Sequence, residues 1–339
     1  MLLVLICYMN DGIILTLAYP ETIVSHAEEW YSKFLPFVFI GNKTHVRAGH
    51  AALVLIDKTT GVLEYHDFGR YITPAPHGRV RGRDTDFELN FPISAEINND
   101  TIQNLDEILK FLAMHAELTH GDGHLHASVC KDINYKKARM HITELQNKGF
   151  IRYAAFAKEA SNCARFVADT LIASVTNTSI KKRLIRSKIF TPSTVGNVVI
   201  ADTENHIYTI SEAGIITTFN STVSKENRRC FLDVLKGYRP SVFGKLIPKS
   251  NTVKKEHAQW LGGIAAGAWF ELYMTEDDTK YRYRRISPHG NVDCDGVYQI
   301  TSEGFEYNAK YTFEHYSNCK FFYVKQNGFL YRFEYLRNF

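Results

Sequence analysis

The sequence has few cysteines for its 339 residues, no basic run interleaved with aromatic residues, and no uninterrupted apolar stretch long enough to cross a membrane. The six cysteines are scattered and include no C-x-x-C pair, which argues against a structural zinc site or a disulfide scaffold. The net charge of +4 is modest for this length. We therefore expect no nucleic acid partner, no transmembrane segment and no cofactor.

The start of the chain is apolar but does not have the pattern of an export signal. The segment MLLVLICYMNDG lacks a basic region and a small-residue cleavage site, and Asn10, Asp11 and Gly12 interrupt it early. Met9 is an alternative initiator. The expected location is therefore cytoplasmic.

Hydrophobic periodicity divides the chain into three segments. Residues 10–200 combine apolar strand-like runs with amphipathic helices, and residues 201–256 indicate a hairpin, a helix and a charged linker. From residue 257 to residue 339 the period changes to two, with many aromatic residues, which is typical of an antiparallel meander or small barrel. We expect this last segment to form its own core, and the fold class to be α+β.

The stretch SNCARFVADTLIAS, residues 161–174, predicts an amphipathic helix with Cys163 in its first turn. Ser161 or Asn162 is a natural N-cap. Unpaired backbone N–H groups and the positive end of the helix dipole then surround the sulfur, which favours a thiolate and can hold an oxyanion. Most free cysteines are small buried hydrophobic residues, so this position alone does not identify a nucleophile.

Two histidines lie on a predicted hairpin upstream of this helix. Residues 48–57 indicate a buried strand with His50 near its start, and residues 61–71 indicate its partner strand with His66. Side chains alternate along a strand, so both histidines share a face only if the loop has an odd number of residues. A three-residue loop with Gly61 in the left-handed conformation would provide this.

With these residues, the chain resembles the circularly permuted papain-like superfamily, which includes permuted NlpC-type hydrolases and the lecithin retinol acyltransferase group. Asn162, Cys163 and Phe166 match the NC-x-x-F core of its signature, His50 matches the strand histidine, and His66 matches the third, polar position. The resemblance implies a papain-like core, an antiparallel sheet with a helix-borne cysteine. Over nearly its whole length the chain also resembles an uncharacterised bacterial family of unknown function.

Candidate substrate-binding residues are Arg70, Arg79, Arg81 and Asn162. Arg79 and Arg81 lie in a proline- and glycine-rich stretch, residues 74–86, for which a solvated loop is the simpler interpretation. The alternative is a clamp for an anionic substrate, because guanidinium groups suit phosphate or carboxylate.

Two further motifs have simpler explanations than ligand binding. His120, His124 and His126 lie close together, but no third ligand with carboxylate spacing accompanies them, and we expect no metal site. Residues 181–188, KKRLIRSK, indicate an exposed helical face, with contact to a membrane surface as the alternative.

The leading hypothesis is a cysteine hydrolase or acyltransferase. Cys163 attacks a carbonyl, His50 acts as general base and then as general acid, and His66 orients His50. The resemblance implies a peptide, amide or lipid-acyl substrate, and leaves amidase, peptidase, thiol esterase and acyltransferase open. The alternative is a non-catalytic binding protein that retains the papain-like core and uses the C-terminal β domain for ligand or partner recognition.

Overall fold

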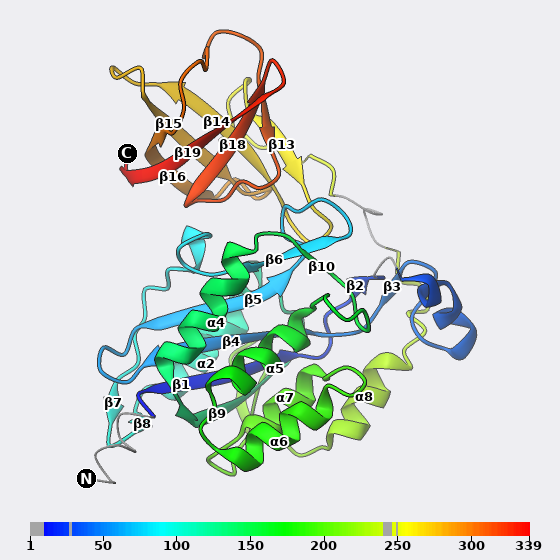
Figure 1. Ribbon diagram of the computed structural model, residues 1–339. Helices are drawn as coiled ribbons and strands as arrows, with labels where there is room; N and C mark the ends of the chain where they lie inside the picture. Colours follow the sequence, from blue (N-terminus) through cyan, green and yellow to red (C-terminus); the bar gives the residue numbers. More distant parts are fainter. Residues whose placement is uncertain (1–9, 27–28, 240–245, 249) are drawn as a thin grey trace.

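The computed structural model describes residues 10–26, 29–239, 246–248 and 250–339. The alternative initiator Met9, Cys7 and the apolar segment that contains them lie outside the described residues, as does part of the predicted linker. The described residues form an α+β chain, with a sheet-and-helix N-terminal part below a C-terminal β domain in Figure 1. Among them, no helix is both long enough and apolar enough to span a bilayer.

The N-terminal part is built on an eight-stranded antiparallel sheet in the order β10-β6-β5-β4-β1-β9-β11-β12. Its strands are β1 (Gly12–Tyr19), β4 (His50–Asp57), β5 (Leu63–Gly69), β6 (His77–Arg81), β9 (Leu125–Ile133), β10 (Ile151–Arg152), β11 (Tyr208–Ile210) and β12 (Ile216–Thr218). Smaller strand pairs are β2 (Val24–Ser25) with β3 (His45–Val46), and β7 (Ile97–Asn98) with β8 (Thr101–Ile102).

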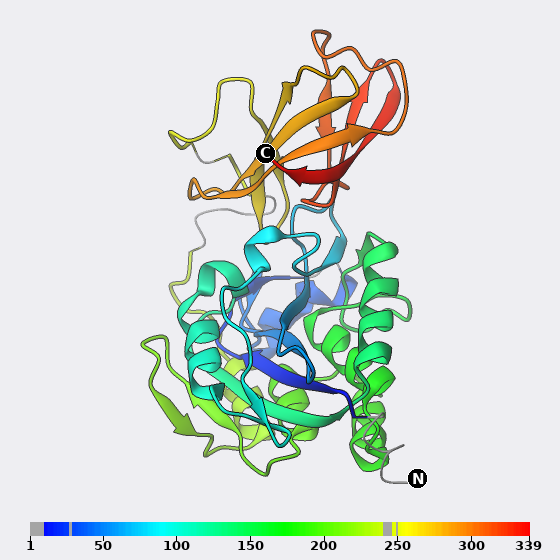
Figure 2. The same cartoon turned by 90° about the vertical axis from the view of Figure 1, so that its left-hand side faces the viewer.

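Helices cover both faces of this sheet. They are η1 (Trp30–Val38), η2 (Phe87–Leu89), α2 (Leu105–Met114), α3 (Ala116–Thr119), α4 (Tyr135–Asn147), α5 (Cys163–Ser174), α6 (Thr178–Ser187), α7 (Thr194–Ala201) and α8 (Val223–Phe231). Figure 2 shows α2 and α4 on opposite sides of the sheet. Strand β1 is buried throughout, which explains why its sequence is a continuous apolar run rather than an alternating one.

Alternation along the central strands sends side chains into two separate cores. Ala52 and Val54 of β4 pack with α2, whereas Leu53 and Leu55 pack with the buried faces of α4 and α5. The parity of a residue in β4 or β5 therefore determines which of these two cores its side chain faces.

The C-terminal domain is a nearly closed antiparallel barrel in the order β13-β14-β15-β16-β19-β18-β17. At the two sheet edges Gln259 donates to the carbonyl of Tyr311 (3.1 Å) and accepts from the amide of Phe313 (2.9 Å). Tyrosine and phenylalanine rings fill the core between the strands. The strands are β13 (Gln259–Gly262), β14 (Gly267–Met274), β15 (Lys280–Ile286), β16 (Val292–Ile300), β17 (Thr312–Glu314), β18 (Phe321–Gln326) and β19 (Phe329–Asn338).

The two parts are joined by main-chain pairing and buried charge. Tyr71, just after β5, forms a parallel bridge with Ala266, and the amide of Ala265 donates to the carbonyl of Arg70 (3.1 Å). Arg285 of the β domain, 1% exposed, forms an ion pair with Asp86 of the N-terminal part at 3.0 Å. The β domain is therefore docked on the end of β5 and the segment that follows β6.

Several sequence expectations differ from these elements. The predicted loop over residues 74–86 is wrong in part, because residues 77–81 form the largely buried strand β6. The hairpin that we assigned to a separate segment, β11 and β12, instead extends the N-terminal sheet, because β11 pairs with β9.

Candidate functional site

Helix α5 presents Cys163 at its N-terminus. The helix begins at Cys163, and the side chain of Asn162 accepts a hydrogen bond from the amide of Arg165 at 2.9 Å, so Asn162 is the N-cap. Asn162 also donates through Nδ2 to the carbonyl of Ala154 (3.2 Å), which fixes the entry into the helix. Cys163 is 6% exposed and lies where backbone N–H groups have no helical partner.

His50 is the first residue of β4 and connects Cys163 with a buried carboxylate. Its Nε2 lies 3.1 Å from Oδ2 of Asp67, and its ring is also within hydrogen-bonding reach of Cys163. Because Nε2–H donates to Asp67, Nδ1 is the ring nitrogen available to the thiol. The imidazole of His50 therefore lies between the thiol of Cys163 and the carboxylate of Asp67.

Asp67 accepts hydrogen bonds from four side chains. Besides His50, these are Arg81, with nitrogen–oxygen distances of 2.9 and 2.7 Å, Tyr71 at 2.8 Å and Tyr65 at 3.2 Å. Burial would raise the pKa of Asp67, but the charge of Arg81 and the bond from His50 outweigh it and hold that pKa well below its usual range. Asp67 is therefore ionised at neutral pH.

The electrostatics of His50 follow from this carboxylate. Burial on its own lowers the pKa of His50, but hydrogen bonds with Asp67 and Cys163 outweigh burial and raise the pKa to about 9. His50 thus readily holds a proton taken from the thiol. His120, which packs against the ring of Tyr71, differs: burial lowers its pKa to about 3, so it stays neutral.

Tyr71 is held over this site by the local sequence. Its ring lies against Arg81, with the guanidinium carbon 3.9 Å from the ring centroid, and a Cβ on Gly69 would come within 2.4 Å of the same ring. A glycine two residues earlier is thus what permits Tyr71 to fold back onto the end of β5 and reach Asp67.

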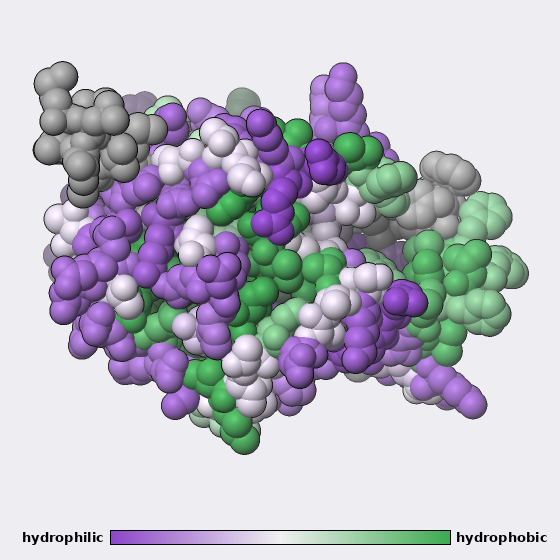
Figure 3. Space-filling model, turned by 90° about the horizontal axis from the view of Figure 1, so that it is seen from below, coloured by the Kyte–Doolittle hydropathy of each residue, from purple (hydrophilic) through white to green (hydrophobic). Residues whose placement is uncertain are grey.

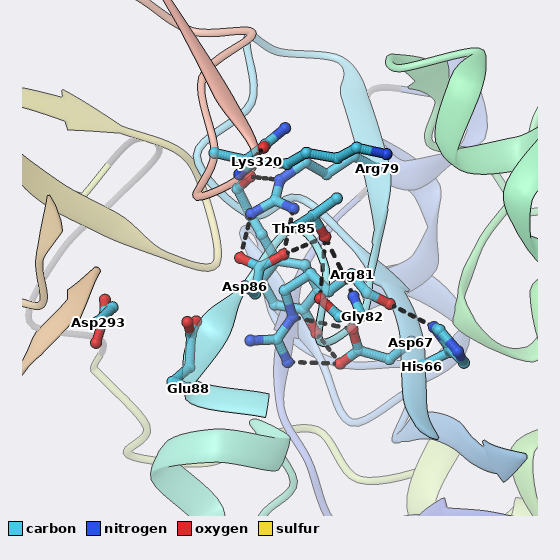
Figure 4. A network of polar contacts seen from close by, with 12 residues as sticks. His66, Asp67, Arg79, Arg81, Gly82, Thr85, Asp86, Glu88, Asp293 and Lys320 are labelled. Carbon is cyan, nitrogen blue, oxygen red and sulfur yellow. Dashed lines mark hydrogen bonds and ion pairs between the residues drawn. The ribbon is translucent and has the colours of Figure 1, made fainter. Parts of the chain in front are cut away.

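His66 does not take the role that the sequence suggested. It is fully buried, its Nδ1 lies 3.1 Å from the carbonyl oxygen of Arg81, and Nε2 lies 3.6 Å from Glu64. The register pairs His66 with Leu53, so its side chain belongs to the face of β5 opposite to that of Asp67. Figure 4 shows His66 on the far side of the Asp67–Arg81 pair.

Loop length explains this difference. Ile56 pairs with Leu63, which leaves six residues between them, an even number, and an even loop places His50 and His66 on opposite faces. Gly61 does adopt the left-handed conformation, with φ of 68°, but within the longer loop. The same parity brings Asp67, the next residue, to the face of His50.

The guanidinium groups of the three candidate arginines bind neighbouring groups of the protein and do not lie in a solvated loop. Arg79 makes two bonds to Asp86 (2.6 and 2.7 Å), Arg81 binds Asp67, and Arg70 donates to the carbonyls of residues 25 and 26 (2.6 and 3.0 Å). Figure 4 shows the Arg79–Asp86 and Arg81–Asp67 pairs, with Glu88 and Asp293 farther towards the β domain.

A cavity of about 840 Å³ opens beside His50, between the two parts of the chain. The N-terminal part contributes His50, Tyr71 and Tyr153 to its wall, and the β domain contributes Trp260 and Asp293. This volume accommodates a ligand larger than a single small acyl group. A ligand that filled this cavity would therefore contact both domains.

Two groups of the site, Tyr153 and Asp67, were not identified from the sequence. Tyr153 lies within hydrogen-bonding reach of Cys163, and its ring stacks on Phe68 with centroids 5.8 Å apart. Asp67 carried one usable signal, its position directly after a candidate histidine on a strand. Within the described residues, no group of three or more His, Cys, Asp or Glu side chains is arranged to hold a metal.

Comparison with known proteins gives two family matches and one similar structure. Residues 14–180 match a family model described as type VI secretion system effector TseH-like, and residues 258–336 match the model described as the DUF6695 C-terminal domain. The crystal structure of the type VI secretion system effector TseH is 17% identical, with a TM-score of 0.39, and the match covers 62% of this chain and 99% of that chain.

None of the curated proteins matches the chain. The family descriptions do not name a papain-like or NlpC-type enzyme, so that resemblance stays a prediction. Residues 14–180, which carry the Cys163 and His50 site, are similar to the TseH-like effector family.

Proposed function

We propose that the chain is a cysteine-dependent hydrolase or acyltransferase that uses Cys163, His50 and Asp67. The observation that carries the proposal is the position of His50, which bonds to the buried, ionised Asp67 through Nε2 while its ring lies within reach of the thiol. Nucleophilic catalysis requires a nucleophile, a base and a group that orients the base, each within hydrogen-bond reach of the next.

In the proposed reaction, His50 accepts the thiol proton and the thiolate of Cys163 attacks the substrate carbonyl carbon. Backbone N–H groups at the start of α5 and the hydroxyl of Tyr153 are the candidate donors to the resulting oxyanion. The intermediate collapses when His50 returns the proton to the leaving amine or alcohol, which leaves an acyl-thioester on Cys163. Water or an acceptor alcohol or amine, deprotonated by His50, then releases the acyl group.

The substrate classes that we propose are a peptide, an amide or a lipid acyl group. The cavity supports a substrate that extends beyond the scissile bond, because its wall continues from His50 to the β domain. The match to a family described as a type VI secretion system effector supports a role as a delivered effector. In that role the chain would leave the cell that makes it, whereas we expected it to remain in the cytoplasm.

The alternative is a binding protein without turnover. The cavity between the domains supports this alternative, because a ligand can bind there without undergoing a reaction. Thiol reactivity separates the two functions, since binding alone places no demand on Cys163.

Labelling of the full chain with iodoacetamide, followed by peptide mapping over a range of pH, tests the proposal. Selective alkylation of Cys163 is expected, with slow alkylation of Cys130 and Cys230, whose thiol pKa values burial raises. A panel of electrophilic peptides and acyl lipids then identifies the substrate class, with Cys163→Ala as the control. Equal and slow labelling of all three cysteines would overturn the catalytic proposal and leave the binding protein.

A further inference from the structure

Helix α6 and the turn after it, residues 178–190, present an outward surface that the proposed chemistry does not use. We call residues 178–190 the α6 surface. Its inner side is apolar, because Ile180 and Leu184 are buried in the core beneath α5. Lys182, Ile185 and Arg186, spaced i, i+3 and i+4, lie on the opposite, exposed side of the helix.

The charge of the α6 surface is of one sign. Its sequence, TSIKKRLIRSKIF, contains five basic residues and no acidic one. Lys188 is neutralised by an ion pair with Asp169. In the part of the chain that the structure describes, the side chains of Lys182, Arg183 and Arg186 have no hydrogen-bond or ion-pair partner. Three cations are therefore available to an anionic partner.

Large apolar side chains lie among these cations. Ile185 is 52% exposed, Ile189 is 75% exposed and Phe190 is 80% exposed. Charge alone would suit any acidic partner, but exposed apolar groups set among lysine and arginine, here along α6 and the turn after it, are typical of segments that lie in the membrane interface. There the cations contact headgroups while the apolar groups enter the acyl boundary.

The position of the α6 surface agrees with such a partner. Figure 1 places α6 at the end of the molecule opposite to the β domain. Figure 3 views that end and shows hydrophobic areas set among hydrophilic ones. A bilayer held there leaves the cavity between the two domains open.

We propose that the α6 surface binds the surface of a bilayer that contains anionic lipid. The binding is peripheral: Lys182, Arg183 and Arg186 contact the headgroups, and Ile189 and Phe190 enter the interface. It is independent of the proposed function, since no residue of the active site takes part.

Co-sedimentation of the full chain with phosphatidylcholine vesicles, with and without about one third phosphatidylglycerol, tests this proposal. Binding to the anionic vesicles, its absence with pure phosphatidylcholine, and its loss on going from about 50 mM to about 500 mM salt are expected. The variant Lys182→Gln/Arg186→Gln should weaken binding roughly 25-fold, at about five-fold per charge.

Two further variants make the result decisive. Ile189→Ser/Phe190→Ser keeps every charge and should still weaken vesicle binding, roughly ten-fold, because it removes the inserted apolar groups. Lys136→Gln/Lys137→Gln removes two exposed charges from α4 and should bind as the parent chain does. The proposal is overturned if the parent chain does not bind anionic vesicles, or if the α4 variant weakens binding as much as the α6 variants.

Discussion

At the scale of single residues, the site depends on Asp67, because one carboxylate both orients His50 and neutralises a buried guanidinium. Arg81 is 2% exposed and Asp67 is fully buried. A buried ion pair is worth little on balance, but removal of one partner leaves the other charge uncompensated. Changes at Asp67 are therefore expected to affect reactivity and stability together.

The substitution Asp67→Asn should slow alkylation of Cys163 roughly 100-fold, because an amide carries no negative charge to stabilise the imidazolium of His50. It should also lower the free energy of unfolding by about 3–5 kcal/mol, since Arg81 loses its counter-charge. Alkylation kinetics and urea unfolding measure the two effects.

His66→Asn is the matched control at the neighbouring position. It should leave the alkylation rate close to that of the parent chain, because His66 lies on the other face of β5. If His66→Asn slows alkylation as much as Asp67→Asn while both variants stay folded, the assignment of Asp67 as the orienting group is wrong.

The raised pKa of His50 predicts how stability changes with pH. In the folded chain the pKa is about 9, above the value of about 6.5 in an unfolded chain. The folded state therefore binds this proton more tightly. The resulting stabilisation is complete below about pH 6.5 and is lost as the pH rises through about 9, with a size of up to about 3 kcal/mol.

Urea unfolding at about pH 6 and about pH 9.5 checks this prediction. The parent chain should lose stability between these two values, and the variant His50→Gln, which cannot titrate, should lose clearly less. Equal losses in the two proteins would show that other groups cause the pH dependence.

At the scale of single elements, the start of α5 decides where the thiol sits. Asn162 caps the helix and at the same time anchors it to the carbonyl of Ala154. A frayed first turn would displace Cys163 and the backbone N–H groups around it, so the cap contributes to reactivity as well as to stability.

We expect Asn162→Ala to cost about 1 kcal/mol in the free energy of unfolding, as loss of an N-cap does elsewhere. Alkylation of Cys163 should slow in the same variant. Asn162→Asp, which keeps an acceptor for the amide of Arg165, should retain most of the stability. If the alanine and aspartate variants unfold alike, the cap does not stabilise α5.

The elements show which parts of the site the sequence could predict. The spacing of apolar residues predicted α5 and its cap, and the apolar run over residues 48–57 predicted the buried β4, because these patterns are local. Identification of the orienting group depended on the number of residues in the loop between β4 and β5. An error of one residue in that number moves every side chain of β5 to the other face of the sheet. Tyr153 could not be found, since stacking on Phe68 is a contact between distant segments.

The arginines illustrate a related difficulty. Proline and glycine around Arg79 and Arg81 indicated a loop, yet both residues lie in β6 and are buried against Asp86 and Asp67. Local propensity is outweighed here because Arg81 pairs with Asp67 on the neighbouring strand β5, and Arg79 pairs with Asp86 just after β6. The pairs could not be derived from spacing.

At the scale of the whole molecule, buried charges connect the two domains. Arg285 contacts Asp86, Glu88 and Asp293, at 3.0, 2.5 and 3.5 Å. Burial raises the pKa of Asp293 to about 7, and the nearby carboxylates add to this effect although Arg285 opposes it. Carboxylates thus outnumber guanidinium groups around Arg285.

Asp293→Asn should therefore stabilise the chain, by an amount that grows from about pH 4 and is complete above about pH 7. The folded pKa of Asp293, about 7, lies above its ordinary value of 3.8, so its ionised form is a cost that is present above about pH 7 and absent below about pH 4. Unfolding at about pH 8 should show a gain of about 2 kcal/mol for the variant, and no gain at about pH 4.

Asp278→Asn, at an exposed position of the same domain, is the control and should change little at either pH. A gain of the same size for Asp293→Asn at both pH values would mean that the amide improves packing and that the charge is not the cause.

Tyr71 belongs to both domains at once. Its hydroxyl donates to Asp67 and its main chain pairs with Ala266 of the β domain. A shift of the β domain therefore reaches the orienting carboxylate through one residue. In evolutionary terms the two halves are not interchangeable modules: a different C-terminal domain could be grafted onto this core without disturbing the proposed nucleophile only if it presented an equivalent backbone strand to Tyr71.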